Sequence, residues 1–286
     1  MSSSSKISGK TDENNDEELA LFSVIRAYDE ECSAIKTDAF GLARQEIQSL
    51  RDKGQYEKIA GLRYNEIDCQ SFYKLLKEAL LLVNSCKESK KDNVFVDFGS
   101  GSGKAVLTAA CLPDLVKEAI GVELVKPLHH LATTVYKSEQ ITKSGGRNSM
   151  APVKLYQGDM FLPKYQEFWQ RANVLFLHCT VFPDELIQRI HETIDKHSPS
   201  SPVIVLTTTR RLDHRHDYAT QLRRQYRVVM KTSLKMAKGI MQCYVHRVEE
   251  KQEGDCKKKR TTTGAEAEED IQEPGETIKK QKKGDG

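Results

Sequence analysis

Three glycines at alternate positions constrain the fold of this chain more than any other segment. The apolar run Val94–Phe98 predicts a buried strand, and Asp97 stands near its carboxyl end. Gly99, Gly101 and Gly103 follow. Because glycine has no Cβ, these positions permit a tight turn and a close approach of the backbone to a ligand. The segment therefore predicts a nucleotide-binding loop between a strand and a helix.

Two common phosphate-binding patterns do not fit this loop. The dinucleotide pattern needs glycine where the chain has Lys104, and the P-loop needs glycine and a hydroxyl residue where it has Phe98 and Ala105. What remains is Asp-x-Gly-x-Gly-x-Gly, which resembles the first motif of class I S-adenosylmethionine (SAM) methyltransferases. A glycine-rich turn without a ligand is the alternative.

Two more acids end the strands that follow. Glu123 closes the apolar stretch Ala119–Val122 and lies 26 residues after Asp97, which leaves room for a helix and a parallel strand. An acid at this place in a βαβ unit accepts hydrogen bonds from ribose hydroxyls, and a helix cap is the alternative. Asp159 ends the next strand, where this kind of fold turns the side chain toward the adenine amino group. An acidic rim suits SAM, which carries a sulfonium cation and no phosphate.

Alternating strand and helix patterns predict an α/β fold with a doubly wound sheet of seven strands. Helical segments separate the first five strands, whereas Lys238-Gly239 joins the last two as an antiparallel pair. The pattern resembles the Rossmann-like class I methyltransferase fold, in which ligands bind beyond the carboxyl ends of the strands. The expected strands are Val94–Phe98, Ala119–Glu123, Val153–Gln157, Asn173–His178, Val203–Thr208, Arg227–Ser233 and Ile240–Val248.

Composition divides the chain into one catalytic domain and two polar ends. Its 286 residues, 38% hydrophobic, permit one core of about 200 residues. We expect a disordered tail over residues 1–16, an N-terminal helical cap over 17–55 and a methyltransferase domain over 56–249. Residues 250–286 should form a disordered charged tail with two basic clusters, Lys257–Arg260 and Lys279–Lys283. Such clusters suggest nuclear import or contact with nucleic acid, and a solubilising tail is the alternative.

Other sequence features exclude several classes. No apolar run approaches the roughly 18 residues that span a membrane, and no signal region is present, so a soluble intracellular protein is expected. The seven cysteines are scattered and predict reduced thiols. No metal site is expected: His214 and His216 stand beside arginines, which favours a solvated basic patch. We expect a monomer.

Several segments, in order, resemble the non-SET histone lysine methyltransferases named for disruption of telomeric silencing, called Dot-type below. Tyr64-Asn-Glu66 precedes a predicted helix over Phe72–Leu82, as a Tyr-Gly-Glu segment does in that family. The glycine loop, Gly121-Val-Glu123 and Gly158-Asp159-Met160 match further motifs. The segment His178–Glu185 is similar to the stretch that follows the fourth strand. The resemblance covers about Tyr56 to Arg247 and implies transfer of a methyl group from SAM to a core lysine of histone H-three in the nucleus, with the cytoplasm as a second location.

The resemblance also assigns roles to residues. It implies an acceptor channel with Tyr64, Thr180 and Phe182 as candidates for its wall. A core position is the alternative for Phe182, and His178 is either a base for a small-molecule acceptor or a hydrogen-bonded histidine at a strand end. Lys104 and His178-Cys179 replace the family's usual glutamine and asparagine. The implied cofactor-binding residues are Tyr64, Glu66, Asp97, Gly99, Ser100, Gly101, Gly103, Lys104, Glu123, Asp159, Met160, His178 and Cys179.

A lysine acceptor imposes a chemical condition. With a pKa of about 10.4, its amine must lose a proton at a cost of about 4.6 kcal/mol at pH 7, which an apolar channel relieves by desolvation. Three functions stay open: a nucleosomal histone lysine methyltransferase, a methyltransferase for another protein or a small molecule, and a non-catalytic interaction protein. Arg210, Arg211, Arg215, Arg223, Arg224 and Arg227 predict either a surface for nucleosomal DNA or a solvated face.

Overall fold

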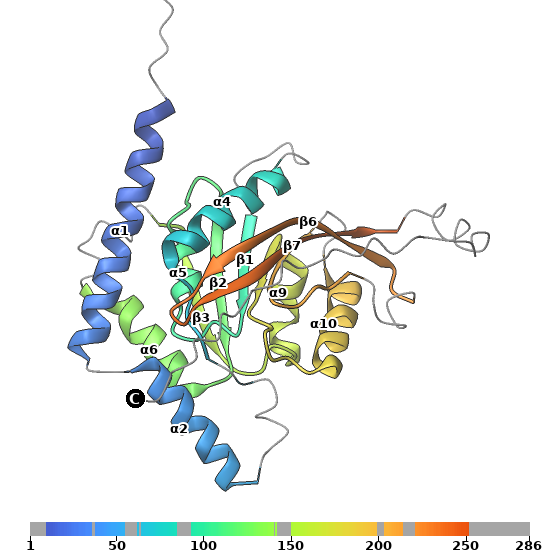
Figure 1. Ribbon diagram of the computed structural model, residues 1–286, viewed down its shortest axis with the longest axis horizontal. Coiled ribbons are helices and arrows are strands. Elements are labelled where there is room, and N and C mark those ends of the chain that lie inside the picture. The colour runs from blue at the N-terminus through green and yellow to red at the C-terminus, as the bar shows by residue number, and fades with distance from the viewer. Residues whose placement is uncertain are drawn as a thin grey trace, which may run out of the picture. The chain divides into compact units, whose positions relative to one another are not determined.

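The computed structural model describes residues 10–35, 38–54, 62, 64–84, 93–139, 141, 150–198, 203–213 and 221–251. Its centre is a seven-stranded sheet in the order β3-β2-β1-β4-β5-β7-β6, with β1 to β5 parallel and β7 antiparallel to both neighbours (Figure 1). This arrangement confirms the predicted α/β fold with a doubly wound sheet of seven strands. The strands are β1 Asn93–Phe98, β2 Val116–Glu123, β3 Val153–Gln157, β4 Val174–Leu177, β5 Val203–Thr208, β6 Arg224–Lys235 and β7 Ile240–Glu250.

Helices cover both faces of the sheet. One hydrophobic cluster joins the sheet to α1, α4, α5 and α6, and a second joins its other face to η1, α9 and α10. Side chains of β1 alternate between the clusters, with Phe95 in the first and Val96 in the second, so this central strand is buried on both faces. The helices are α1 Lys10–Ala34, α2 Ala39–Asp52, α4 Cys69–Asn84, α5 Lys104–Ala110, α6 Lys126–Lys137, η1 Pro163–Tyr165, α9 Gln166–Arg171 and α10 Asp184–His197.

Local sequence explains where the helices near the site begin. Asp38 caps α2 by accepting the backbone N–H of Phe40, and Asp68 accepts the N–H of Ser71 at the start of α4. Gly103 precedes α5 in the left-handed conformation, with φ of 86°. The turn into α5 therefore depends on glycine.

Several predicted boundaries differ from the structure. Helix α1 begins at Lys10, so residues 10–16, which we expected to be disordered, are helical. Strand β6 begins at Arg224 instead of Arg227, because Arg224 pairs with Glu250 at the far end of β7. Residues 1–9 and 252–286, including both basic clusters of the C-terminal tail, lie outside the described residues, as do His214 and His216.

Three further observations concern the described residues only. None of the helices is long and apolar enough to cross a membrane. No group of three or more metal-ligating side chains occurs. The described cysteines, Cys32, Cys69, Cys111, Cys179 and Cys243, are free thiols.

Candidate active site

The glycine loop joins β1 to α5 at the carboxyl edge of the sheet. Gly99, Gly101 and Gly103 have φ angles of 96°, 54° and 86°, a region that other residues enter only with strain. The backbone N–H groups of Gly99 and Ser100 donate to the Val122 carbonyl at 2.8 and 3.2 Å. These two bonds fasten the loop to the end of β2.

Glu123 holds the same loop from the end of β2. Its Oε2 accepts the Gly101 N–H and its Oε1 accepts the Val125 N–H, each at 2.6 Å. Burial raises the pKa of this carboxyl above its ordinary value, although the backbone donors lower it. The sequence predicted a partner for ribose hydroxyls. In the structure Glu123 lines the cavity and also ties the glycine loop to the start of α6.

Asp97 lies beside Glu123 with one carboxylate oxygen unsatisfied. Its side chain is 2% exposed, and Oδ1 has no hydrogen-bond partner among the described residues. Burial, followed by the charge of Glu123, raises the pKa of Asp97 well above its ordinary value. A buried carboxylate oxygen without a donor is costly. A cationic or N–H-bearing ligand would satisfy it, and SAM carries both an ammonium group and a sulfonium.

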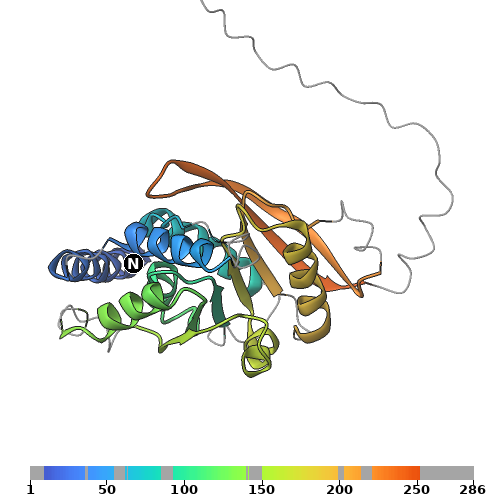
Figure 2. The same ribbon diagram turned by 90° about the horizontal axis from the view of Figure 1, so that it is seen from below.

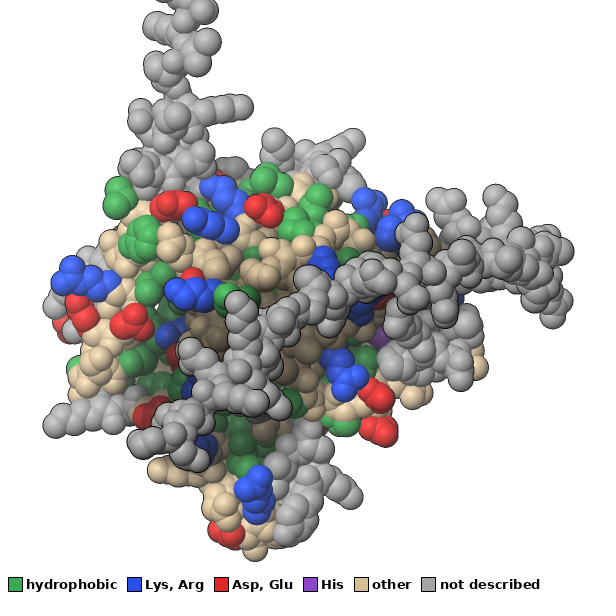
Figure 3. All heavy atoms as spheres, in the orientation of Figure 1, with side chains coloured by type: hydrophobic (Ala, Val, Ile, Leu, Met, Phe, Trp, Pro, Cys, Tyr) green, Lys and Arg blue, Asp and Glu red, His purple; other side chains and the backbone are tan. Residues whose placement is uncertain are grey.

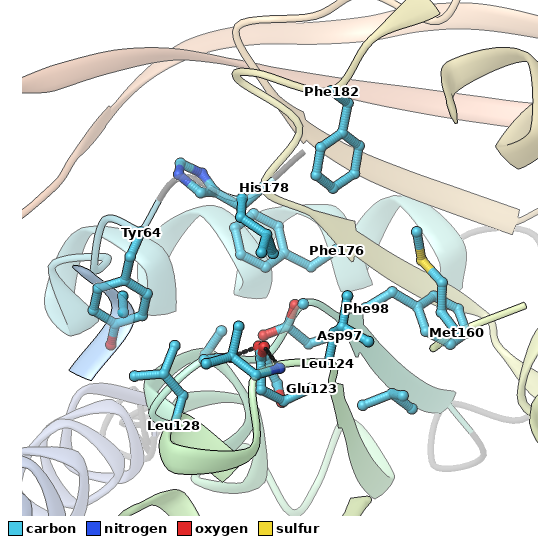
Figure 4. A pocket seen from close by; sticks show the side chains of 18 of the residues that line it. Tyr64, Asp97, Phe98, Glu123, Leu124, Leu128, Met160, Phe176, His178 and Phe182 are labelled. Carbon is cyan, nitrogen blue, oxygen red and sulfur yellow. Dashed lines mark hydrogen bonds between the residues drawn. The ribbon is translucent and has the colours of Figure 1, made fainter. Parts of the chain in front are cut away.

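These groups border a cavity of about 750 Å³ beyond the carboxyl ends of β1, β2 and β4. Figure 4 shows Asp97 and Glu123 together at its centre, Tyr64 and Leu128 toward one end, and Met160 toward the other. Phe176, His178 and Phe182 lie on the opposite side from the two carboxylates. The volume falls within the range of small-molecule sites, about 300–1,000 Å³.

Tyr64 closes one side of the cavity over the glycine loop. A Cβ on Gly101 would lie 2.7 Å from Tyr64 Cε2, so the ring packs directly against this glycine. The Tyr64 hydroxyl donates to Glu66 Oε1 at 2.5 Å, and the Ser102 hydroxyl donates to the same oxygen at 2.9 Å. Burial and the charge of Glu66 raise the pKa of Tyr64, which keeps it a neutral donor.

Lys104 points toward Glu66. Its Nζ lies 2.8 Å from Glu66 Oε2 and 3.6 Å from Asp29 Oδ1. Burial lowers the pKa of Lys104, but Glu66 and the other negative groups outweigh it and raise the pKa overall. The charge that stands where relatives carry glutamine is thus paired within the protein.

The N-terminal helix α1 reaches the glycine loop. The Tyr28 hydroxyl donates to the Ser102 carbonyl at 3.0 Å, and the Tyr28 ring lies 5.2 Å from Lys104 Nζ. Helix α2 contributes the cavity-lining residues Ala43 and Ile47. The N-terminal helices therefore complete the site.

The segment after β4 forms the side opposite the carboxylates. His178 Nδ1 lies 2.9 Å from the Thr208 hydroxyl, and Phe182 is 9% exposed. Cys179 and Thr180, by contrast, do not line the cavity. The Cys179 side chain is fully buried with its thiol on the Thr208 carbonyl, and the Thr180 hydroxyl lies 3.2 Å from those of Thr208 and Thr209.

The structure brings most of the predicted site residues together. Gly103 does not line the cavity, because it faces Ala132 of α6, to which a Cβ would come within 3.2 Å. The cavity-lining residues among those predicted are Tyr64, Glu66, Asp97, Gly99, Ser100, Gly101, Lys104, Glu123, Asp159, Met160, His178 and Phe182.

Sequence reasoning missed the apolar residues of the lining. They come from six segments, and most of them stand beside a predicted motif, as Ile67 does after Glu66, Leu124 after Glu123 and Phe161 after Met160. The missed lining residues include Ala43, Ile47, Leu62, Ile67, Leu124, Val125, Leu128, Phe161, Phe176 and Leu186.

A family model described as "Histone methylation protein DOT1" matches residues 45–241. The chain belongs to this family. This confirms the Dot-type resemblance, and the chain is a SAM-dependent methyltransferase whose cofactor is SAM. No curated protein sequence matches the chain significantly.

Solved structures similar to this DOT1-family chain include an RNA methyltransferase from Salinibacter ruber in complex with S-adenosylhomocysteine. It is 18% identical, with a TM-score of 0.40, over 63% of this chain and 93% of that one. Another is TYW2 from M. jannaschii in complex with SAM, 13% identical, with a TM-score of 0.40, over 64% of this chain and 77% of that one.

Proposed function

We propose that this chain methylates a lysine side chain of a nucleosomal histone, most directly a core lysine of histone H-three. The family model that covers residues 45–241 describes histone methylation, and this is its first support. The second is the structure of the cavity, which has an acidic side and an apolar side.

The acidic side fits a cationic cofactor. Asp97 and the carboxylate of Glu123 lie together at the cavity centre, and the space beside Gly99, where a Cβ would stand, is open. Asp97 would hold the ammonium group of SAM, and Glu123 its ribose hydroxyls. The cofactor supplies an electrophilic methyl group bonded to sulfur.

The apolar side of the cavity supports lysine as the acceptor of the methyl group. Phe182 and Phe176 face the cavity across from the carboxylates, and Met160 lies toward one end (Figure 4). An amine that enters among these side chains loses hydration, which favours its neutral form and exposes the nitrogen lone pair. This desolvation offsets the cost of about 4.6 kcal/mol for deprotonating lysine at pH 7. Tyr64, bonded to Glu66, packs over the glycine loop at one end of the cavity.

The decisive experiment incubates the purified full-length chain with SAM carrying a tritiated methyl group. Parallel reactions contain reconstituted nucleosomes, free core histones, total cellular RNA or a whole-cell protein extract. We expect label on one core histone, and mass spectrometry should place it on lysine. Gly101→Arg serves as the inactive control.

Each alternative gives a distinct result. Label on RNA, on a small molecule or on another protein would overturn the histone proposal and keep the enzyme. Absence of label in every reaction, together with absence of SAM binding by calorimetry, would favour a non-catalytic interaction protein.

A further inference from the structure

The β6–β7 hairpin carries its only two acids, Glu249 and Glu250, at the end of β7 far from the turn, where they pair with arginines of the same hairpin. Between Arg224 and Val248 the chain has six Lys or Arg residues and no Asp or Glu. Over the whole chain the two kinds of charge nearly balance, with 44 basic and 41 acidic residues. The part of the hairpin around the turn, which holds Lys231, Lys235 and Lys238, therefore has no acid in its own sequence.

The hairpin has one packed face and one open face. Leu234 and Met236 are buried in the core, whereas Lys231, Ser233 and Lys235 are exposed. Residues directly opposite in an antiparallel pair share a face. The open face therefore also holds the partners that the register gives to these three residues, namely Tyr244, Gln242 and Ile240.

The predicted arginine surface, by contrast, is neutralised. Each described arginine of that set lies within 4.0 Å of an acid: Arg210 with Asp184, Arg211 with Asp213, Arg223 with Asp195, Arg224 with Glu250 and Arg227 with Glu249. On the face drawn in Figure 3, basic and acidic side chains are interspersed. No such ion pair involves Lys231 or Lys235 within the described part of the chain, and Lys238 lies over the Phe40 ring at 3.9 Å.

The end of the hairpin is bonded to the wall of the cavity. The Ala237 N–H donates to the Glu66 carbonyl at 2.7 Å, and the Lys238 N–H donates to Asn65 Oδ1 at 3.2 Å. Asn65 and Glu66 both line the cavity. Figure 2 shows the hairpin extending beyond the rest of the sheet above α2 and α4. A polymer lying along the open face would therefore run beside the cavity wall.

We propose that the open face of this hairpin binds the sugar–phosphate backbone of duplex DNA. Duplex DNA carries one negative charge per about 1.7 Å of its axis, so it is attracted to a cationic face that has no acids. Ser233, Gln242 and Tyr244 are side-chain types that hydrogen-bond phosphate oxygens. The inference rests on the proposed nucleosomal substrate, because the DNA of a nucleosome would lie next to the histone lysine. Lysines on an edge strand also discourage aggregation, which is the competing explanation.

The test measures binding of a fluorescent DNA duplex by anisotropy across a series of salt concentrations. Lys231→Glu/Lys235→Glu should weaken binding more than 10-fold at low salt and reduce the slope of log affinity against log salt by about 2. The control is Lys137→Glu/Lys196→Glu, which changes net charge equally at exposed positions of α6 and α10. Equal effects of the two double variants, or none, would overturn the proposal.

A second measurement separates this inference from the proposed function. DNA binding is recorded without SAM and without histones, so it succeeds or fails independently of methyl transfer. If single-stranded RNA competes better than duplex DNA, the assignment to DNA is wrong. A gain in aggregation by light scattering, with DNA affinity unchanged, would assign the lysines to edge protection and also overturn it.

Discussion

The floor and the wall of the cavity are built in opposite ways. The floor, from Asp97 to Val125, is one βαβ segment whose backbone groups bond to each other and to Glu123. The wall joins Asn65 to Lys238, residues 173 positions apart. A local motif thus fixes where the cofactor binds, whereas long-range contacts decide what covers it.

The largest expected effect comes from a substitution in the floor of the cavity. Gly101→Arg should abolish SAM binding, because Gly101 has φ of 54° and a side chain there would strike Tyr64. Calorimetry measures the binding, and circular dichroism checks that the variant is folded. The control is Gly54→Arg, because Gly54 also has a positive φ, of 66°, but a side chain there would meet open space. Methylation by the Gly101 variant would show that the loop has another role.

The next prediction separates binding from stability within the floor. Asp97→Asn should weaken SAM binding by about 10-fold or more, the cost of losing a charged hydrogen-bond partner. Without cofactor, the variant should nevertheless have a higher melting temperature than the wild type, because it no longer buries an unsatisfied carboxylate. The rise should be about 2–4 °C for each kcal/mol gained in the free energy of unfolding. Calorimetry and thermal unfolding measure the two effects, and a lower melting temperature would contradict the prediction.

The same residue sets a pH dependence. The pKa of Asp97 is raised in the folded state, so the folded protein keeps a proton that the unfolded chain has released. Stability of the cofactor-free protein should therefore fall as the pH rises from about 3.9 through the raised pKa. Affinity for SAM should rise over that range. Both trends should flatten in Asp97→Asn.

A smaller effect is expected on the acceptor side. Phe182→Ala should lower the rate of methyl transfer by about 10-fold near pH 7. The smaller side chain lets water reach the acceptor amine and raises its pKa, and each unit by which the pKa rises lowers the neutral fraction of the amine tenfold. The pH optimum should move upward, and affinity for SAM should change little. Thr180→Val, outside the cavity, should stay near wild-type activity, and Phe182→Leu should retain most of it. If Thr180→Val lowers methyl-transfer activity more than Phe182→Ala does, the acceptor channel lies elsewhere.

The smallest expected effect concerns the ion pair between Lys104 and Glu66 in the wall of the cavity. Lys104→Gln, Glu66→Gln and the double variant form a cycle whose coupling should be about 1–2 kcal/mol, since the pair is mostly buried at 2.8 Å. Urea unfolding measures it, and Arg26→Gln/Glu30→Gln gives the exposed-pair comparison. A coupling free energy of zero would mean that Lys104 does not stabilise the wall through Glu66, and would point to a role for Lys104 in cofactor binding.

The sequence by itself determined the floor of the site. Alternate glycines between Asp97 and a helix, with Glu123 at the next strand end, specify a loop and its position, because strand spacing and glycine geometry are local properties. The seven strands followed from their apolar runs for the same reason. The family motifs then pointed to SAM, which the family assignment confirms.

Only the tertiary structure decided the rest. In the structure Lys104 pairs with Glu66, Cys179 and Thr180 lie outside the cavity lining, and helix α1 begins at Lys10. The tertiary structure also paired the described arginines of the predicted surface with acids, and left Lys231 and Lys235 without an ion pair among the described residues. Ion pairing, burial and side-chain direction depend on which distant segments meet, and no local pattern encodes that choice.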